Sequence, residues 1–417
     1  MYYSYSLKNN QNKISLVVLI SFFFIFFIPI DMINGFLIRN NFPSLSAFYK
    51  SLVLLFVSIY LLKAKKPLYV IGIILLILFF ILLHLLTLSY TYNVFSGLNM
   101  FIRFCAILLF YLFFIELIKK QKIKYIFIIV YFSFWFLVLN IILGAIGYGY
   151  GMYGGNGEDS IGTRGLIFAG NEIGGAIIVS GAIIMLKLIE ENNYLKFFIY
   201  GIILIFMGGL MASKVSILGS ILLLFFFPLL KLFKSFKNFR IPKRVFIYSQ
   251  LMLLVIPIIS VYGIYYALYK SNLIDRLLFF YQRVDLLTFI FSSRNIWAEE
   301  AINVFSNKYN LTNVFFGTGI DWFKYISGNK LVEIDPIDLL MSYGIIGFGI
   351  IFGILFYIIF DFFRKTNPYS VYIIFTIFLL LSISLTAGHI LTSGTAGFLI
   401  AILMALGKYD TRRINNK

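Results

Sequence analysis

Long apolar runs recur along the chain and are separated by shorter polar segments. A helix that crosses a membrane needs about 20 mostly apolar residues, and the sequence offers twelve runs that approach this length. Their approximate bounds are 14–30, 45–62, 68–88, 99–118, 124–146, 166–189, 197–212, 215–233, 246–269, 337–361, 370–387 and 389–407. The pattern predicts an all-α polytopic membrane protein of about 12 transmembrane helices, with residues 1–417 forming a single membrane domain.

Basic residues gather in alternate gaps between these runs, and short loops rich in lysine and arginine stay in the cytoplasm. The clusters on that side are Lys8 with Lys13, Lys63–Lys66, Lys119–Lys124, Lys231–Arg244, Arg364 with Lys365, and Lys408–Lys417. We therefore expect both termini in the cytoplasm. Most of the 17 acidic residues fall in the opposite gaps, so the functional polarity is expected outside, in the short loop 147–165 and the long loop 270–336.

Composition agrees with a membrane protein. Hydrophobic residues make up 61% of the chain and charged residues 12%, with a mean hydropathy of +0.94, which excludes a soluble enzyme and a disordered chain. The net charge of +18 comes largely from residues beside the apolar runs, where they act as topology signals and contact anionic lipid headgroups. We expect no nucleic-acid partner. Cys105 is the single cysteine, which excludes an intrachain disulfide and a cysteine-based metal site.

The short outer loop 147–165 begins with alternating glycine and tyrosine. We expect a tight irregular loop whose rings, including Tyr153, either stack on sugar faces or serve as interfacial tyrosines of a flexible connector. Arg164 ends this loop, and Asn171 and Glu172 follow early in the next apolar run. An amide and a carboxylate in such a run need a cavity or a polar partner. We favour a cavity, with a helix-packing site as the alternative.

The long outer loop 270–336 is not a polar linker, and we expect it to pack on the bundle. Apolar residues at helical spacing over 273–287 predict a short amphipathic helix, either at the membrane interface or packed on the other helices. Arg276 and Arg283 share another face of that helix. Lys214 is a separate outward cation, either a snorkelling lysine or one aimed at an anionic ligand.

A second short helix is predicted after Ser292 and Ser293, which are suitable capping residues. Arg294 stands at its start, and Trp297 lies on its apolar side.

Three carboxylates, Glu333, Asp335 and Asp338, stand within six residues at the mouth of the run that begins near 337. Acids and Pro336 suit a helix start, but this role accounts for one acid better than for three. A carboxylate near a cavity and arginines can also act as a general base. We favour Asp335 for that role because it lies between the loop and Pro336. His389 is the other outward titratable group, and a lone histidine of this kind is more often structural.

Several motifs recur in one order along residues 160–400. They are Arg164-Gly165, Ser213-Lys214, Ser292-Ser293-Arg294 before the Trp297 helix, Phe316-Gly-Thr-Gly319, and Glu333-x-Asp335 with Asp338-Leu-Leu before Gly344-Ile-Ile-Gly347. In this order they resemble the O-antigen and capsular-polysaccharide repeat-unit polymerases (Wzy-type) and the wider superfamily of O-antigen ligase-like membrane glycosyltransferases. The arrangement is also similar to the lipid-II polymerases of the shape and division family.

Details of the resemblance favour a polymerase over a ligase. Arg164 and Gly175 are similar to the Arg-x10-Gly motif of some polymerases. A second such motif is not matched, because Phe305 stands at that spacing from Arg294. The ligases carry a histidine near the position of Glu333, and this chain has none there.

The resemblance implies that repeat units carried on undecaprenyl diphosphate are joined at the outer face of the bacterial cytoplasmic membrane. A sugar hydroxyl of one unit attacks the anomeric carbon of the growing chain, and undecaprenyl diphosphate leaves. Arginines can clamp phosphates bidentately, and an outward lysine adds charge. The candidate diphosphate-binding residues are Arg164, Arg276, Arg283, Arg294 and Lys214. We expect no cofactor and no metal, since neither a nucleotide motif nor a metal-binding cluster is evident.

Three other functions compete with a polymerase: a ligase, a polysaccharide-lipid flippase or other transporter, and a non-catalytic assembly partner. Transporters often contain two related halves, whereas the halves of this sequence differ. We expect the lipid-linked oligosaccharide, membrane lipids, a flippase and a chain-length regulator as partners.

Overall fold

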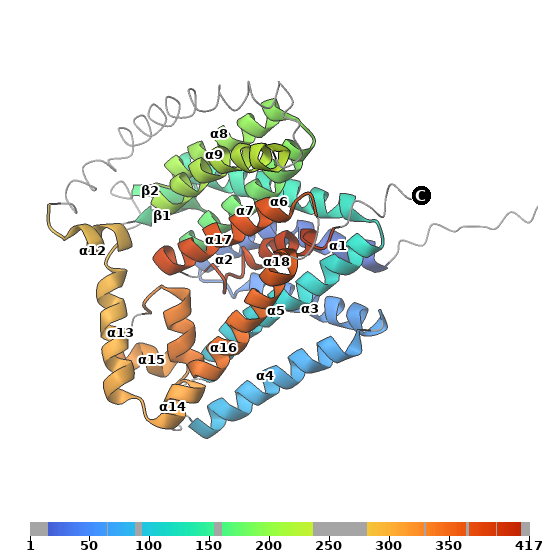
Figure 1. Cartoon of the computed structure of the whole chain (residues 1–417). Coiled ribbons are helices and arrows are strands. Elements are labelled where there is room, and N and C mark those ends of the chain that lie inside the picture. The colour runs from blue at the N-terminus through green and yellow to red at the C-terminus, as the bar shows by residue number, and fades with distance from the viewer. Residues whose placement is uncertain are drawn as a thin grey trace, which may run out of the picture.

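Helices dominate the structure, a computed structural model that describes residues 16–64, 66–87, 94–153, 161–236, 282–328, 331–363, 367–388 and 390–409 (Figure 1). The helices are α1 (Leu16–Ile25), α2 (Phe27–Arg39), α3 (Leu45–Lys63), α4 (Pro67–Thr87), α5 (Val94–Lys119), α6 (Ile123–Ala145), α7 (Gly170–Glu190), α8 (Tyr194–Leu210), α9 (Lys214–Phe236), α12 (Leu286–Phe291), α13 (Arg294–Lys308), α14 (Leu311–Phe316), α15 (Ile320–Ile326), α16 (Asp335–Phe363), α17 (Ser370–Ala387) and α18 (Gly397–Leu406). The strands are β1 (Tyr150–Tyr153) and β2 (Ile161–Gly165).

The chain is a mostly helical, multi-pass membrane protein, as its apolar runs predict. Within the described ranges, six helices are long and apolar enough to cross a membrane, or up to seven if the pair α1 and α2, bent by 43°, forms one span. The predicted run 246–269 and both chain ends lie outside the described residues. The total of twelve spans and the cytoplasmic termini therefore stay predictions.

The predicted span 389–407 is wrong in its first half. α18 covers only Gly397–Leu406, and ten residues at 1.5 Å each give about 15 Å, half the thickness of a hydrocarbon core. Residues 390–396 are irregular, because hydroxyl side chains compete with helical backbone bonding. The hydroxyls of Ser393 and Thr395 bond to carboxylates on α7 and α2. These irregular residues become a wall of the site described below. Together with Gly388 we refer to them as the segment 388–396, in which residue 389 lies outside the described residues.

α7 lies in the middle of the helical bundle. Of 18 consecutive residues in this helix, 89% are buried. The helix packs on α6, α8, α9, α17 and α18. α18 also packs on α5. Close packing of this kind holds the start of α7 and the segment before α18 in fixed positions.

α16 is broken at Gly344, whose φ of 64° and ψ of −174° are not helical. Two carbonyl groups just before the break accept hydrogen bonds from the turn that follows α14. The Thr318 N–H donates to the Met341 oxygen at 3.3 Å, and the Gly319 N–H donates to the Ser342 oxygen at 3.0 Å. The break in α16 therefore forms the docking point of the long outer loop.

The outer loop 147–165 contains a β-hairpin instead of the irregular loop expected from its sequence. β1 and β2 pair antiparallel, with Tyr150 opposite Gly165. Gly165 has a φ of 64°, and a Cβ there would lie 2.1 Å from the Asn140 carbonyl oxygen. The Asn140 side chain of α6 donates to the Arg164 carbonyl at 2.9 Å. These contacts fix Arg164 just before α7.

The described part of the long outer loop, with α12 to α15, forms one side of the molecule (Figure 1). Most of the amphipathic helix predicted over 273–287 lies outside the described residues. Of its described end, 282–285 are not helical, whereas 286 and 287 begin α12. The second predicted helix is confirmed as α13. Ser293 is at its N-cap position but has a φ of 69° and makes no capping bond. Trp297 packs partly buried on a small cluster centred on Ala301, Phe323, Val332, Ile334 and Met341.

Candidate functional site

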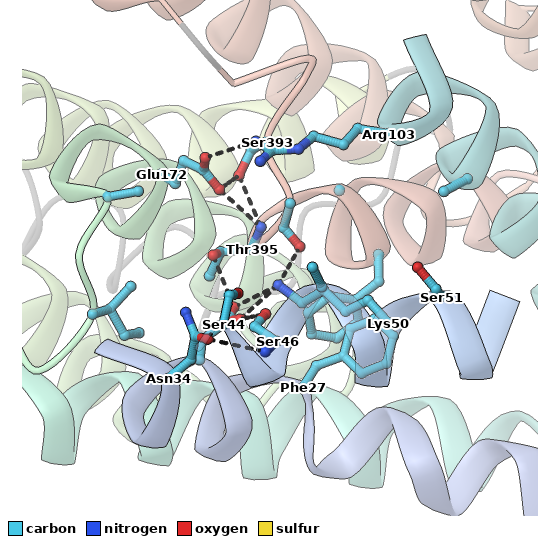
Figure 2. A pocket seen from close by; sticks show the side chains of 18 of the residues that line it. Phe27, Asn34, Ser44, Ser46, Lys50, Ser51, Arg103, Glu172, Ser393 and Thr395 are labelled. Atoms are coloured by element: carbon cyan, nitrogen blue, oxygen red, sulfur yellow. Dashed lines mark hydrogen bonds and ion pairs between the residues drawn. The ribbon is translucent and has the colours of Figure 1, made fainter. Parts of the chain in front are cut away.

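A cavity of about 330 Å³ lies at the end of the bundle where α2 ends and α3 and α7 begin, and Figure 2 draws it from close by. Its walls come from α2, α3, α5, the start of α7 with the residues before it, the irregular segment 388–396 and the start of α18. Much of the wall is apolar, and this part includes Phe27, Leu54, Ile107, Phe110, Ile167 and Phe398. Four charged side chains share the same cavity, namely Asp31, Lys50, Arg103 and Glu172. We refer to it as the outer cavity, because the sequence predicts this end of the bundle to face outward.

Lys50 of α3 and Asp31 of α2 form an ion pair in the outer cavity, with 2.7 Å between the Lys50 Nζ and one carboxylate oxygen. The Lys50 ammonium also donates to the Gly394 carbonyl at 2.8 Å. Asp31 in turn accepts from the hydroxyls of Ser46 at 2.5 Å and Thr395 at 2.9 Å. The Asp31 side chain is 6% exposed and that of Lys50 is 20% exposed, so the lysine side chain is the more accessible of the two.

Glu172 holds the same irregular segment from the opposite side. Its carboxylate accepts from the Ser393 hydroxyl at 2.7 Å and from the Thr395 N–H at 3.0 Å. Arg103 of α5 approaches the other carboxylate oxygen only to 3.5 Å, and 44% of the Arg103 side chain is exposed. Figure 2 shows Arg103 reaching toward Glu172 and Ser393 from α5. Glu172 is therefore firmly held, whereas Arg103 can turn toward a ligand.

A second group of charges lies in the long outer loop. Arg294, the first residue of α13, donates to the Glu333 carboxylate at 2.5 Å. Glu333 has a φ of 59°, and 36% of its side chain is exposed, against 13% for Arg294. A positive φ is uncommon outside glycine and marks a position held by its surroundings. The ion pair and this conformation present the Glu333 carboxylate to solvent.

The other two carboxylates of the acidic motif are fully buried. One oxygen of Asp335 accepts from the Ser384 hydroxyl at 2.8 Å and from the backbone N–H groups of Ile390 and Leu391 at 2.9 and 3.0 Å. Asp338 accepts from the Val332 N–H at 3.0 Å. Both acids hold backbone on either side of the site, so Glu333 is the accessible member of the three.

The segment 388–396 connects the outer cavity with the Arg294–Glu333 pair. At its beginning, Gly388 has a φ of 60°, and a Cβ there would lie 2.0 Å from the Glu333 carbonyl oxygen. At its end, Ser393 and Thr395 bond to Glu172. The two charged groups therefore border the same short stretch of chain.

Arg164 lies beside the outer cavity, stacked between aromatic rings. Its guanidinium carbon is 5.0 Å from the ring centres of Tyr150 and Phe168, and Nη1 donates to the Phe168 carbonyl at 2.6 Å. Burial lowers the pKa of Arg164, but an arginine stays charged at neutral pH. Phe168 lines the cavity, so Arg164 shapes its rim.

The remaining predicted site residues are less closely grouped. Arg283 is exposed in the turn before α12, and Lys214 is the half-buried first residue of α9. Arg276 and His389 lie outside the described residues, as do the side chains of Asn171 and Tyr153. Among the described residues, no three His, Cys, Asp or Glu side chains come together in a way that could hold a metal ion.

Sequence reasoning missed most of the outer cavity. Lys50 lies in the second predicted run and Arg103 in the fourth, and neither is among the candidate site residues predicted from the sequence. A signal was available, because ionisable residues inside an apolar run mark functional sites by default. Ser393 and Thr395 give no such signal, because they lie in the run 389–407, whose sequence predicts a continuous helix.

Comparison with known proteins matches residues 281–409 to the family described as O-antigen ligase like membrane protein. This range contains Arg294, the acidic motif and the segment 388–396, and it confirms the resemblance to the O-antigen ligase-like superfamily. The match indicates a membrane enzyme of polysaccharide assembly. No curated protein and no solved structure matches the chain significantly.

Proposed function

We propose that this protein is a polymerase of the bacterial cytoplasmic membrane that joins undecaprenyl-diphosphate-linked oligosaccharide repeat units. The products are O-antigen, capsular or exopolysaccharide chains at the outer face. The observation that carries the proposal is the outer cavity, in which Lys50 and Arg103 stand beside apolar walls. A lipid diphosphate has an anionic head and an apolar tail, so it needs both kinds of surface in one place. The family match supports the same class of substrate.

In this proposal Lys50 and Arg103 bind the diphosphate. Asp31 and Glu172 keep the two cations in position before the ligand arrives, and such preorganisation reduces the cost of binding. The weak 3.5 Å contact between Arg103 and Glu172 allows the guanidinium to move to a phosphate, for which its planar fork is well suited. Arg164 shapes the rim, and Arg283, Arg276 and Lys214 remain candidates for further phosphate contacts.

Glu333 is the proposed general base, in place of Asp335. The acceptor hydroxyl transfers its proton to the Glu333 carboxylate while its oxygen forms a bond to the anomeric carbon of the donor. The bond between that carbon and the diphosphate oxygen breaks, and the diphosphate leaves with the electron pair. Arg294 is shared between Glu333 and the negative charge that develops on the leaving group, a role in which arginine is effective. Asp335 and Asp338 position the surrounding backbone.

Sugar binding in this proposal involves the groups around the two charged sites. Trp297 follows Arg294 on α13, and Tyr153, Asn171 and His389 remain proposed contacts to the oligosaccharide. A ligase is the second candidate, favoured by the description of the matched family. It would use the same donor and the same leaving group with a different acceptor.

Deletion of the gene in its natural host distinguishes the candidates. Loss of a polymerase leaves single repeat units at the outer face, either lipid-linked or transferred singly to the acceptor. Loss of a ligase leaves long lipid-linked chains that never reach their acceptor. Loss of a flippase traps the lipid-linked unit inside. We expect the deletion strain to accumulate single repeat units. Accumulation of long lipid-linked chains instead would show that the protein is a ligase and not a polymerase.

A further inference from the structure

A second cavity, of about 770 Å³, lies where α4 begins and α5 ends. Part of α16 and the residues after α18 complete its walls. It is remote from the outer cavity, because Arg103 and Lys119 are separated by about 24 Å along α5 at 1.5 Å per residue. We call it the basal cavity.

Three lysines line the basal cavity, namely Lys66, Lys119 and Lys408. They come from three separate basic clusters that the sequence predicts to be cytoplasmic. The fold brings these clusters, far apart along the chain, around a single hollow. Basic cavities between transmembrane helices on the cytoplasmic side suit anionic lipid headgroups.

The charges in the basal cavity are only partly balanced. Lys119 is 3.2 Å from Glu116, and half of its side chain is exposed. Lys408 pairs with Asp361. Lys66 lies over the ring of Tyr69 at 5.2 Å, with no carboxylate within salt-bridge distance among the described residues. The cavity is therefore open to an additional negative charge near Lys66.

Apolar and tyrosine side chains provide the remaining surface. Leu112, Ile115 and Ile118 of α5 and Ile358 of α16 line the interior. Tyr69 and Tyr357, which are 55% and 73% exposed, also line it. Tyrosines with this exposure are typical of the membrane–water boundary. A ligand that fits must combine a negative head with apolar chains.

We infer that the basal cavity binds an anionic phospholipid of the cytoplasmic leaflet, such as phosphatidylglycerol. Its phosphate lies between Lys66 and Lys119, the tyrosine hydroxyls donate to headgroup oxygens, and the acyl chains follow the α5 and α16 side chains. The site does not take part in the proposed reaction at the outer end. Its test is therefore independent of whether the protein is a polymerase or a ligase.

The experiment is native mass spectrometry of the full-length protein, exchanged from detergent into phosphatidylglycerol or phosphatidylcholine. The test variant is Lys66→Gln/Lys119→Gln. The matched control is Lys124→Gln/Lys196→Gln. Both lysines are exposed and do not line the cavity. Lys196 lies in the gap between runs 166–189 and 197–212, which the alternation of loops places on the same side as Lys124. One lysine near an anionic lipid surface contributes about 1 kcal/mol to binding, which corresponds to about a fivefold change in affinity. We therefore expect phosphatidylglycerol retention to fall about 30-fold in the test variant and to stay near wild type in the control.

Soluble glycerol 3-phosphate, added to the wild-type protein, separates a lipid site from a plain anion site. If a lipid is the ligand, millimolar glycerol 3-phosphate leaves phosphatidylglycerol bound, because it lacks the acyl chains. Displacement of the lipid by glycerol 3-phosphate overturns the inference. Equal retention of phosphatidylcholine, or equal losses in the test and control variants, overturns it as well.

Discussion

Arg294 and Glu333 meet at 2.5 Å although 39 residues separate them along the chain. Their ion pair closes the long outer loop by joining the start of α13 to the residues just before α16. A diphosphate that draws Arg294 away would leave Glu333 free to act on an acceptor hydroxyl.

Replacing Glu333 and Asp335 separately distinguishes catalysis from structure. Glu333→Gln keeps the shape but removes the base, so we expect the polymerisation rate to fall by about 10²–10⁴-fold with nearly normal folding. Asp335→Asn places an amide group beside three hydrogen-bond donors in a buried site. We expect it to cost about 1–3 kcal/mol of stability, with polymer made in proportion to the folded protein that remains.

Polymer length on glycan gels and thermal unfolding in detergent measure the two effects. Glu300→Gln is the matched control. Glu300 is exposed on α13, so this substitution removes the same charge without touching the Arg294–Glu333 pair. Normal chain length in Glu333→Gln, at wild-type abundance, would rule out Glu333 as the base.

The ion pair in the outer cavity allows a related test. Lys50→Met leaves the Asp31 carboxylate without its cation, and we expect a loss of about 1.5–3 kcal/mol, typical of a charged hydrogen bond. The double variant Asp31→Asn/Lys50→Met removes both charges and should recover much of that stability. If Lys50 binds the diphosphate, the double variant stays inactive although it folds. Polymer synthesis by the stable double variant would show that Lys50 has only a structural role.

Most of the membrane helices could be predicted from the sequence. Runs of apolar residues near the required length are a local property, and α3, α5 and α6 begin and end within a few residues of the predicted bounds, apart from the earlier start of α5. The sequence also marked Arg294 and Glu333 as site residues. It did not pair them, because their contact depends on how α13 to α15 fold back onto α16.

The outer cavity could not be predicted, because its geometry is tertiary. Asp31, Lys50 and Thr395 are distant in sequence and meet only when α2, α3 and the segment 388–396 pack together. That segment is also apolar enough to be read as a span. Its irregular path depends on carboxylates elsewhere, namely Asp335 and Glu172, which replace the backbone bonds that a helix would have made.

Cysteine labelling tests the predicted orientation. After replacement of buried Cys105, single cysteines at Lys308 and Lys119, both exposed, report on opposite ends of the bundle. We expect an impermeant maleimide to label position 308 in intact cells and position 119 only after the membrane is opened. Labelling of 119 alone in intact cells would invert the topology, and with it the placement of the outer and basal cavities.

Gly344 tests how the long loop is docked. Its φ is 64°, and a Cβ there would lie 2.4 Å from the backbone carbonyl carbon of Phe315. Gly344→Ala therefore has a strained backbone, at a cost of about 1–3 kcal/mol. It also pushes the turn at Gly317–Gly319 away from α16. Gly349→Ala, five residues further along the same helix, meets nothing within 4 Å and should be neutral or stabilising by about 0.5–1 kcal/mol. Limited proteolysis of the long loop, together with thermal unfolding, should show faster cleavage and lower stability for the first variant only. Equal behaviour of the two alanine variants would mean that the break in α16 does not hold the loop.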